Sequence, residues 1–507
     1  MRVTRRNLVK GLAAVPLFSA PKSPLDVPPA TQPFTYIVAI VGSPSTPDVA
    51  WSDEELKAIK GIGFNTLQMS IAWAWKPAHE VLNLEDLDDP KNAAEWHRRV
   101  ALAKKFGFRT LAHFGVPKTA LADATAACIL DLSVRESYAN RLRRLFREFP
   151  EVDDVMIYTY DQRAWLCSEF GNCPRCRGIP LSKRLPGFLE EMVDAVQAAK
   201  PGARLWWEPW ELSAGQTYAI TESIRPEHFG LIVHNSIAEV QFVNTTDHWL
   251  QNLARIAQRR GIPVMGEAFL SDSGEDIAPL THLACPRLVY QEARALRNTR
   301  GVVGIKEYFG LAPEDFSANV KLLKAYLAAP EAPFDVLIAS VAAEYGKLSW
   351  NALLEAWEAT AEAMELFPWD ASWHMRGVFG TPLDQSWRSV PLASWITPSW
   401  QANRRAFYMV SDERRAVSPL WEDAEMASPW KERAQIYSHQ HPWLLEDVAL
   451  RALASANAFD RASASLKKAL VDASAKKADI ERQLQNVSQA ARVSRHVGEE
   501  LLAALRA

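Results

Sequence analysis

Five acidic residues lie at or just after the ends of four short apolar runs of this sequence. The acids are Asp161, Glu208, Glu211, Glu267 and Glu307. Hydrolysis of a glycosidic bond commonly needs two carboxyl groups, one to protonate the leaving oxygen and the other to act as base or nucleophile. These five residues are therefore the candidate catalytic residues.

Glu267 is the first choice among the five, because Gly266 before it leaves room for a ligand to approach closely. Asp161 is the second choice. A general acid needs a raised pKa, which burial against Trp207 or Trp210 would provide. The competing interpretation is structural: Lys306 lies next to Glu307, and several of the acids would then form ion pairs in the barrel mouth.

Other polar and aromatic residues follow the same apolar runs and are candidates for binding a substrate. Indole rings offer a sugar a flat apolar face, and the chain has 19 Trp residues. An amide such as that of Gln162 hydrogen-bonds a sugar hydroxyl or acetamido group. The candidate substrate-binding residues are Trp73, Trp75, Lys76, His113, Gln162, Trp210, His234, Asn235 and Tyr308.

Three cysteines, Cys167, Cys173 and Cys176, lie shortly after Asp161. A disulfide within the cluster is the first expectation for a chain outside the cytoplasm, a zinc site the second, and free thiols the third. Cys128 and Cys285 stand alone in the sequence, which weakens the case for zinc. In each case the cluster is expected to hold the loop that carries Asp161 and not to attack a substrate.

Eight apolar runs alternate with helical stretches and must position these residues. The runs are Tyr36–Gly42, Phe64–Ser70, Lys105–Phe114, Asp154–Tyr160, Pro201–Glu208, Phe229–His234, Arg260–Glu267 and Arg300–Glu307. Continuous apolar strands between helices predict a parallel sheet covered on both faces. Eight units over residues 34–330 predict a closed (β/α)8 TIM barrel, whose functional groups gather at the carboxyl ends of the strands. An open doubly wound sheet is the alternative, but no Gly-rich phosphate fingerprint follows the first run.

The two ends of the chain differ from the predicted barrel. Arg5 and Arg6, followed by Leu8, Lys10 and the apolar run Gly11–Ala20, resemble a twin-arginine export signal, with a linker over 21–33. The protein is therefore expected to be exported to the periplasm or the extracellular space. Residues 331–507 are expected to be mainly α-helical and rich in Trp, with an irregular Trp- and Pro-rich stretch over 367–430.

The composition argues against two classes of partner. A net charge of −3 without long Lys/Arg blocks gives no reason to expect nucleic acid. The apolar run near the N-terminus is too short for stable membrane insertion. The expected partner is an oligo- or polysaccharide substrate, no cofactor is expected, and the oligomeric state stays open.

An acid at the end of the fourth run, a Cys-Pro-x-Cys loop, and then a strand ending in Trp207-Glu208-Pro209-Trp210 resemble bacterial (β/α)8-barrel glycoside hydrolases, loosely the hexosaminidase-like group. The likeness covers residues 34–320 and implies a glycosidase. Substrate-assisted hexosaminidases have an Asp-Glu pair where this chain has Asp161-Gln162. The resemblance therefore implies no acetamido-assisted mechanism and does not choose the sugar.

Two other functions remain open. One is a metal-dependent hydrolase, isomerase or lyase on the same barrel, with His113, His234 and Glu267 as ligands. The other is a non-catalytic carbohydrate-binding barrel, in which the Trp-rich stretch over 367–430 grips a polysaccharide or packs on the barrel as a lid.

Overall fold

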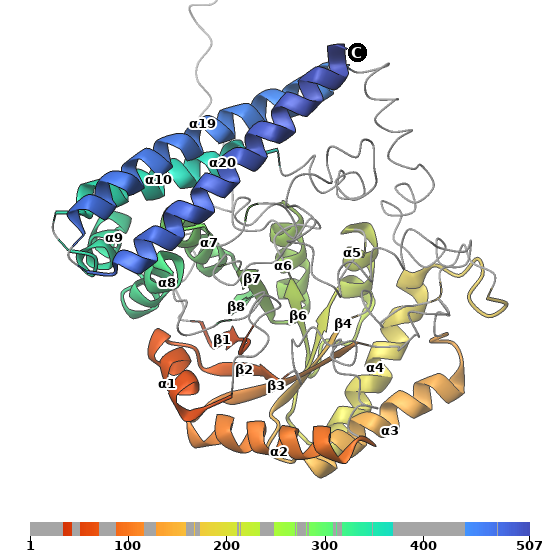
Figure 1. Ribbon diagram of the computed structural model, residues 1–507. Helices are drawn as coiled ribbons and strands as arrows, with labels where there is room; N and C mark the ends of the chain where they lie inside the picture. The colour runs from red at the N-terminus through yellow and green to blue at the C-terminus, as the bar shows by residue number, and fades with distance from the viewer. Residues whose placement is uncertain are drawn as a thin grey trace, which may run out of the picture.

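Eight parallel strands alternate with helices and close into a barrel, with β1 hydrogen-bonded to β8 (Figure 1). This arrangement, followed by a helical C-terminal region, confirms the predicted TIM barrel. The computed structural model describes residues 34–42, 51–69, 88–115, 128–158, 167, 173–209, 212, 214–233, 248–268, 270, 280, 283–307, 311, 317–346, 348–368, 442–473 and 475–506.

Each of the eight apolar runs corresponds to one strand of the barrel, and β3 and β7 extend one residue beyond their runs. The strands are β1 (Tyr36–Ala39), β2 (Thr66–Met69), β3 (Arg109–Gly115), β4 (Asp154–Tyr158), β5 (Leu205–Glu208), β6 (Phe229–Val233), β7 (Val264–Ala268) and β8 (Val302–Glu307). The helices that cover them are α1 (Asp53–Ile62), α2 (Pro90–Lys105), α3 (Leu132–Glu148), α4 (Leu181–Ala199), α5 (Ala214–Ser223), α6 (His248–Arg260), α7 (Pro286–Asn298) and α8 (Ala318–Ala328).

Helix α1 shows how local sequence places an element. The Ser52 hydroxyl accepts a hydrogen bond from the amide of Glu55 at 3.2 Å, and the Glu55 carboxylate accepts one from the amide of Ser52 at 3.2 Å. This capping box satisfies two amides that the first turn of a helix leaves without helical partners. It fixes the start of α1 where the Ser-x-x-Glu spacing predicts it.

An apolar layer fills the middle of the barrel. Six residues from six different strands form one buried cluster, and only the barrel interior brings those strands together: Val38, Leu111, Met156, Trp206, Ile232 and Met265. A Cβ on Gly230 would lie 2.5 Å from the Trp206 ring, so only glycine leaves room for this indole. The layer closes the interior to water and supports whatever lies above it, toward the carboxyl ends of the strands.

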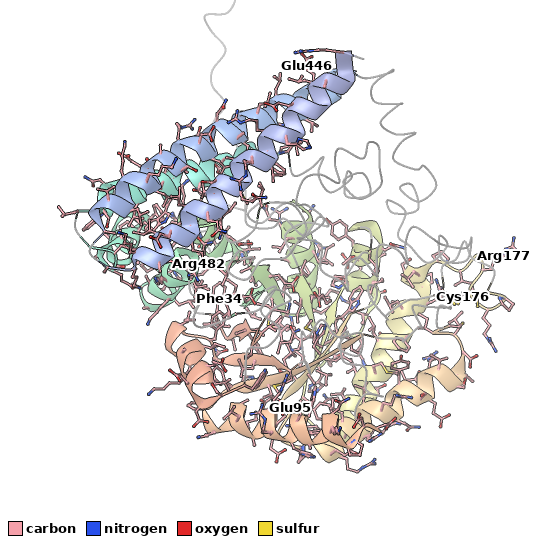
Figure 2. All side chains as sticks on the ribbon, in the orientation of Figure 1. Phe34, Glu95, Cys176, Arg177, Glu446 and Arg482 are labelled. Atoms are coloured by element: carbon pink, nitrogen blue, oxygen red, sulfur yellow. The ribbon has the colours of Figure 1, made fainter. Side chains whose placement is uncertain are left out.

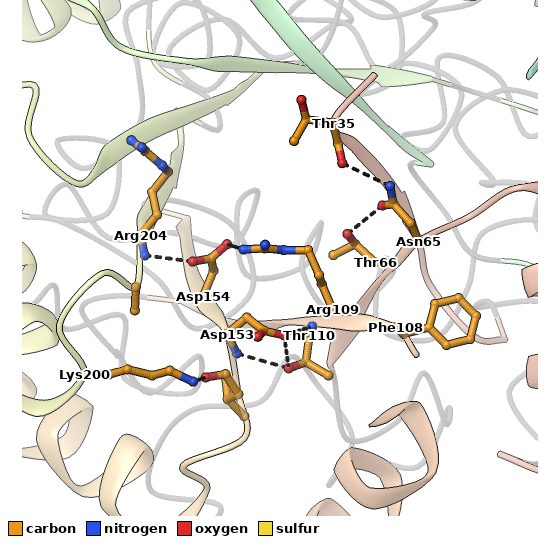
Figure 3. Close-up of polar contacts among 12 residues, drawn as sticks. Thr35, Asn65, Thr66, Phe108, Arg109, Thr110, Asp153, Asp154, Lys200 and Arg204 are labelled. Carbon is orange, nitrogen blue, oxygen red and sulfur yellow. Dashed lines mark hydrogen bonds and ion pairs between the residues drawn. The ribbon is translucent and has the colours of Figure 1, made fainter. Parts of the chain in front are cut away.

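A set of ion pairs and hydrogen bonds closes the opposite, amino-terminal end of the barrel (Figure 3). The buried Asp154 carboxylate accepts from the Arg109 guanidinium at 3.1 Å and from the Arg204 amide at 2.8 Å. The Arg109 guanidinium lies 5.1 Å from the centroid of the Tyr36 ring, which packs edge-on against Trp206. Asp154 is therefore a buried acid with a structural role, at the end of the barrel where active sites are not found.

Four further helices follow the barrel, in agreement with the predicted helical C-terminal region. They are α9 (Phe334–Ala343), α10 (Trp350–Leu366), α19 (Pro442–Asp472) and α20 (Lys477–Arg506). Helices α10, α19 and α20 lie together against the side of the barrel near α7 and α8 (Figure 1). Arg287 on α7 forms ion pairs with two residues of α10, Glu358 at 2.9 Å and Glu365 at 2.8 Å.

Helices α10, α19 and α20 pack around an apolar core of their own and also form buried hydrogen bonds with one another. The Trp357 indole donates to the Gln483 side chain at 2.9 Å, and the Ser455 hydroxyl donates to the Ala363 carbonyl at 2.7 Å. No helix in the described part of the chain is both long enough and apolar enough to cross a membrane. The predicted Trp- and Pro-rich stretch lies outside the described residues, apart from Phe367 and Pro368.

Candidate active site

A polar layer lies directly above the apolar layer, at the carboxyl ends of the strands. Side chains alternate along a strand, so a residue two positions after an interior residue also faces the interior. His113 follows Leu111 by two positions, Glu208 follows Trp206, and Glu267 follows Met265. The members of this polar layer come from five strands and are all buried: Gln68, His113, Glu208, Glu267 and Lys306.

Glu267 on β7 and Lys306 on β8 form a buried ion pair. The Lys306 ammonium donates to the Glu267 carboxylate, and their side chains are 3% and 0% exposed. Burial opposes the charge on Lys306, but the carboxylates of Glu267 and Glu208 outweigh burial, so the pKa of Lys306 lies above its ordinary value. The ammonium thus stays charged, bonded to Glu267 and close enough to Glu208 for the two charges to interact.

His113 on β3 adds a neutral imidazole to this centre. Burial, and then the positive charge of Lys306, lower the pKa of His113 to about 3. The Gln68 amide nitrogen lies 2.8 Å from Nδ1. Because an amide NH2 group only donates, Nδ1 is the acceptor and the ring proton lies on Nε2. That nitrogen is 4.0 Å from the Glu208 carboxylate, so the imidazole directs a donor toward Glu208.

The structure brings three predicted site residues together: Glu267, Glu208 and His113. Glu307 is also buried, but strand alternation directs it away from the interior that Lys306 faces. Its charge acts less on the pKa of Lys306 than those of Glu267 and Glu208. The remaining predicted site residues lie outside the described residues: Asp161, Glu211, Trp73, Trp75, Lys76, Gln162, Trp210, His234, Asn235 and Tyr308.

Two expectations about neighbours of these acids are wrong. Gly266 leaves no room for a ligand: a Cβ there would lie 2.3 Å from the Leu296 side chain on α7, so the glycine allows the helix to pack closely. Trp207 does not bury a catalytic acid, because it packs with Phe229 in the core between the strands and the helices. Both residues alternate with interior residues and therefore face outward.

Two members of the polar layer, Lys306 and Gln68, are not among the predicted site residues. The sequence suggests Glu307 as the ion-pair partner of Lys306, yet its partner is Glu267 on the neighbouring strand. The available signal was a polar residue inside an apolar run, since Lys and Gln are seldom fully buried unless a partner satisfies them.

The cysteines form a cluster apart from the polar layer, and Cys128, which stands alone in the sequence, belongs to it. The sulfur atoms of Cys128, Cys167, Cys173 and Cys176 all lie within 4.8 Å of one another. No disulfide joins the five cysteines, all of which are among the described residues, so the first expectation is not met. Within those residues the cluster is the one group of His, Cys, Asp and Glu side chains spaced to hold a metal ion.

Comparison with known proteins finds similarity in structure and not in sequence. No family model matches the sequence, and no curated protein matches it. A GH138 enzyme that targets pectin rhamnogalacturonan II superposes with a TM-score of 0.53 at 10% identity, over 93% of this chain and 58% of that chain. The chain thus spans a little over half the length of this relative.

A second solved structure, an O-GlcNAc hydrolase from Thermobaculum terrenum, superposes with a TM-score of 0.44 at 12% identity, over 93% of this chain and 97% of that one. At such identities the likeness establishes the fold alone. Both of these structures are glycoside hydrolases, and a specific link to the hexosaminidase-like group stays a prediction.

Proposed function

We propose that the chain is a glycoside hydrolase that cleaves a glycosidic bond with two carboxyl groups at the carboxyl rim of the barrel. One observation carries the proposal: Glu208, Glu267, His113 and Lys306 converge from four strands on the layer where the carboxyl ends of the strands meet. Barrel enzymes place their catalytic groups at this end. The likeness in fold to a glycoside hydrolase agrees with the proposal.

Glu267 is our choice for the base or nucleophile, because the Lys306 ammonium donates a hydrogen bond to its carboxylate. A charged carboxylate suits a base that activates water or a nucleophile that attacks the sugar, and not a group that must deliver a proton. Lys306 also supplies the positive charge that lowers the energetic cost of burying this acid.

A second carboxyl group is needed to deliver the proton to the leaving oxygen. Asp161, three residues beyond the end of β4, is our choice for the general acid. It follows a strand whose carboxyl end meets the same rim. Glu208 then acts as a positioning residue, held near the neutral imidazole of His113. Glu211 is the reserve candidate for either role.

The substrate is proposed to be an oligo- or polysaccharide. Trp73, Trp75, Lys76, Gln162, Trp210, His234, Asn235 and Tyr308, which follow the strands in the sequence, would surround it. We also propose that Arg5 and Arg6 direct the chain out of the cytoplasm. Replacing both arginines by lysine should retain the protein in the cytoplasmic fraction, whereas replacing Lys10 should not.

Activity screening of variants tests the proposed roles. Glu267→Gln and Asp161→Asn should each lower turnover about 100-fold or more on the chromogenic glycoside that the parent cleaves best. Glu54→Gln, an equivalent change at an exposed position of α1, is the control and should retain full activity. Full turnover by both active-site variants would show that the assignment is wrong.

The two alternatives give different results in the same assays. A metal-dependent enzyme would lose activity on chelation and keep it in Asp161→Asn, although Lys306 beside Glu267 opposes a cation there. A non-catalytic binding barrel would retain oligosaccharides without turning any of them over. Chelation has to be tested in a cysteine variant as well, because the cysteine cluster could also take up metal.

A further inference from the structure

Four cysteines from two loops meet beside the barrel. Cys128 comes shortly before α3, in the connection that follows β3, whereas Cys167, Cys173 and Cys176 lie in the connection from β4 to α4. Three of the side chains are buried and that of Cys173 is partly buried. Figure 2 shows Cys176 and Arg177 in the turn before α4, on the side of the molecule away from the C-terminal helices.

The distances between the sulfur atoms are those of ligands around one ion and not those of a disulfide. Sγ of Cys128 lies 3.2 Å from Sγ of Cys176 and 3.7 Å from Sγ of Cys173. A disulfide bond is about 2.05 Å long. Tetrahedral zinc with Zn–S bonds of about 2.3 Å separates its sulfur ligands by about 3.8 Å. Four thiols within 4.8 Å of one another need only small side-chain adjustments to reach that arrangement.

Backbone amides hold the turn that carries Cys173 and Cys176. In the turn Cys173-Pro174-Arg175-Cys176, the amides of Arg175 and Cys176 donate to the Cys173 sulfur. The amides of Cys176 and Arg177 also donate to the Cys173 carbonyl, at 3.2 and 3.0 Å, and hold the turn closed. Such amide–sulfur bonds orient a ligand and offset the charge of a metal–thiolate centre.

Arg184 on α4 fixes the position of the second loop. Its buried guanidinium donates to the Cys167 carbonyl at 2.8 Å and to the Ile179 carbonyl at 2.8 Å, so it ties the chain before and after the Cys173–Cys176 turn. Four thiolates around a divalent ion carry a net negative charge, and Arg184 lies where it offsets part of that charge.

We propose that Cys128, Cys167, Cys173 and Cys176 bind one zinc ion as a four-sulfur structural site. Soft thiolate ligands in a tetrahedral set select zinc or iron over the hard ions, and a site with all four positions filled by protein has no open position for catalysis. The site joins the β3–α3 connection to the β4–α4 connection. In the sequence, Asp161 and Gln162 lie between the end of β4 and Cys167, so the ion would anchor the chain that carries them.

Metal content and thiol reactivity of the full chain test this proposal independently of any glycosidase activity. Protein purified without chelator should contain about one zinc ion per chain by elemental analysis. A mercurial reagent should release that zinc in proportion to four thiols. Replacement of zinc by Co²⁺ should give the intense visible absorption of tetrahedral cobalt thiolate, whereas bound iron would give a coloured protein before replacement.

Single serine variants locate the site. Cys128→Ser and Cys176→Ser should lose the zinc or bind it much more weakly. Cys285→Ser is the matched control, because Cys285 is buried but lies outside the cluster, and this variant should keep about one zinc ion per chain. If the cluster variants fail to fold, the mercurial titration of the parent still gives the ratio of thiols to zinc.

Two results would overturn the proposal. One is a parent protein that holds no zinc after purification and takes up neither Zn²⁺ nor Co²⁺ under reducing conditions. The other is an intact mass that shows two disulfides among the four cysteines. A zinc-loaded protein without turnover on any glycoside would refute the proposed function and leave the zinc site standing.

Discussion

The neutral state of His113 predicts that the stability of the barrel falls as the solution becomes mildly acidic. In the unfolded chain a histidine has a pKa of about 6.5, whereas burial and Lys306 lower the pKa of His113 to about 3 in the folded protein. Below about pH 6.5 the unfolded state therefore binds one more proton than the folded state. Stability linked to this residue is present above that pH and is lost as the pH falls toward 3.

The magnitude follows from the two pKa values. Between about pH 7.5 and about pH 5 the unfolded histidine becomes almost fully protonated, which lowers the free energy of unfolding by about 2 kcal/mol. The result depends little on the exact folded value, because any folded pKa well below 5 leaves the native imidazole neutral over this range. These values predict the contribution of His113 to the pH dependence of stability, and other titrating groups add their own contributions to it.

Comparison with a variant isolates the contribution of His113. Urea unfolding, followed by Trp fluorescence at both pH values, should show a fall in stability that is smaller by about 2 kcal/mol in His113→Asn than in the parent. His228→Asn is the control: His228 is exposed and has a φ of 57°, a conformation that Asn tolerates well. Equal pH dependence in the parent and His113→Asn would refute a neutral buried imidazole, as would an imidazole NMR signal that titrates near pH 6.

Two further predictions concern the strands that carry the site. Lys306→Met leaves the buried Glu267 carboxylate without its cation and should lower the free energy of unfolding by about 3–5 kcal/mol. The double variant Lys306→Met with Glu267→Gln should be less destabilised than Lys306→Met alone. A double variant whose loss of stability equals the sum of the losses in the two single variants would argue against the pair. Gly266→Ala places a Cβ against Leu296 and should lower the free energy of unfolding by about 1–3 kcal/mol, measured by urea unfolding. Adding Leu296→Ala should remove part of the cost of this clash. Unchanged stability in Gly266→Ala would contradict the close packing of α7 on β7.

The barrel was predictable because each of its units is encoded locally. An apolar run, a glycine turn and a capped helix recur along the chain, and the capping box at Ser52 fixes one helix start without help from distant residues. The eight runs predicted the eight strands. What the sequence did not reveal is which face of a strand a residue occupies.

The reason is that both faces of a parallel barrel strand are apolar. One face packs in the interior and the other against the helices, so the pattern of hydrophobic residues does not alternate. Trp206 and Trp207 are chemically identical neighbours, yet one lies in the interior and the other between sheet and helix. Gly266 was assigned to the wrong side for the same reason.

The cysteine cluster was missed in part for a different reason. Cys173 and Cys176 are close in sequence and visibly form a motif, but Cys128 belongs to another connection of the barrel. The two connections come together because β3 and β4 pair as neighbours in the barrel. A fourth ligand of this kind is invisible until the topology is known.

The packing of the C-terminal helices bears on how many residues can lie between α10 and α19. Contacts of Glu355 with Ser465 and of Glu362 with Arg461 show that α10 and α19 run antiparallel, so the chain leaves and re-enters this packing unit at the same end. The entropy of closing a loop grows only slowly with its length. A change in the number of residues between these two helices should therefore cost the barrel little stability.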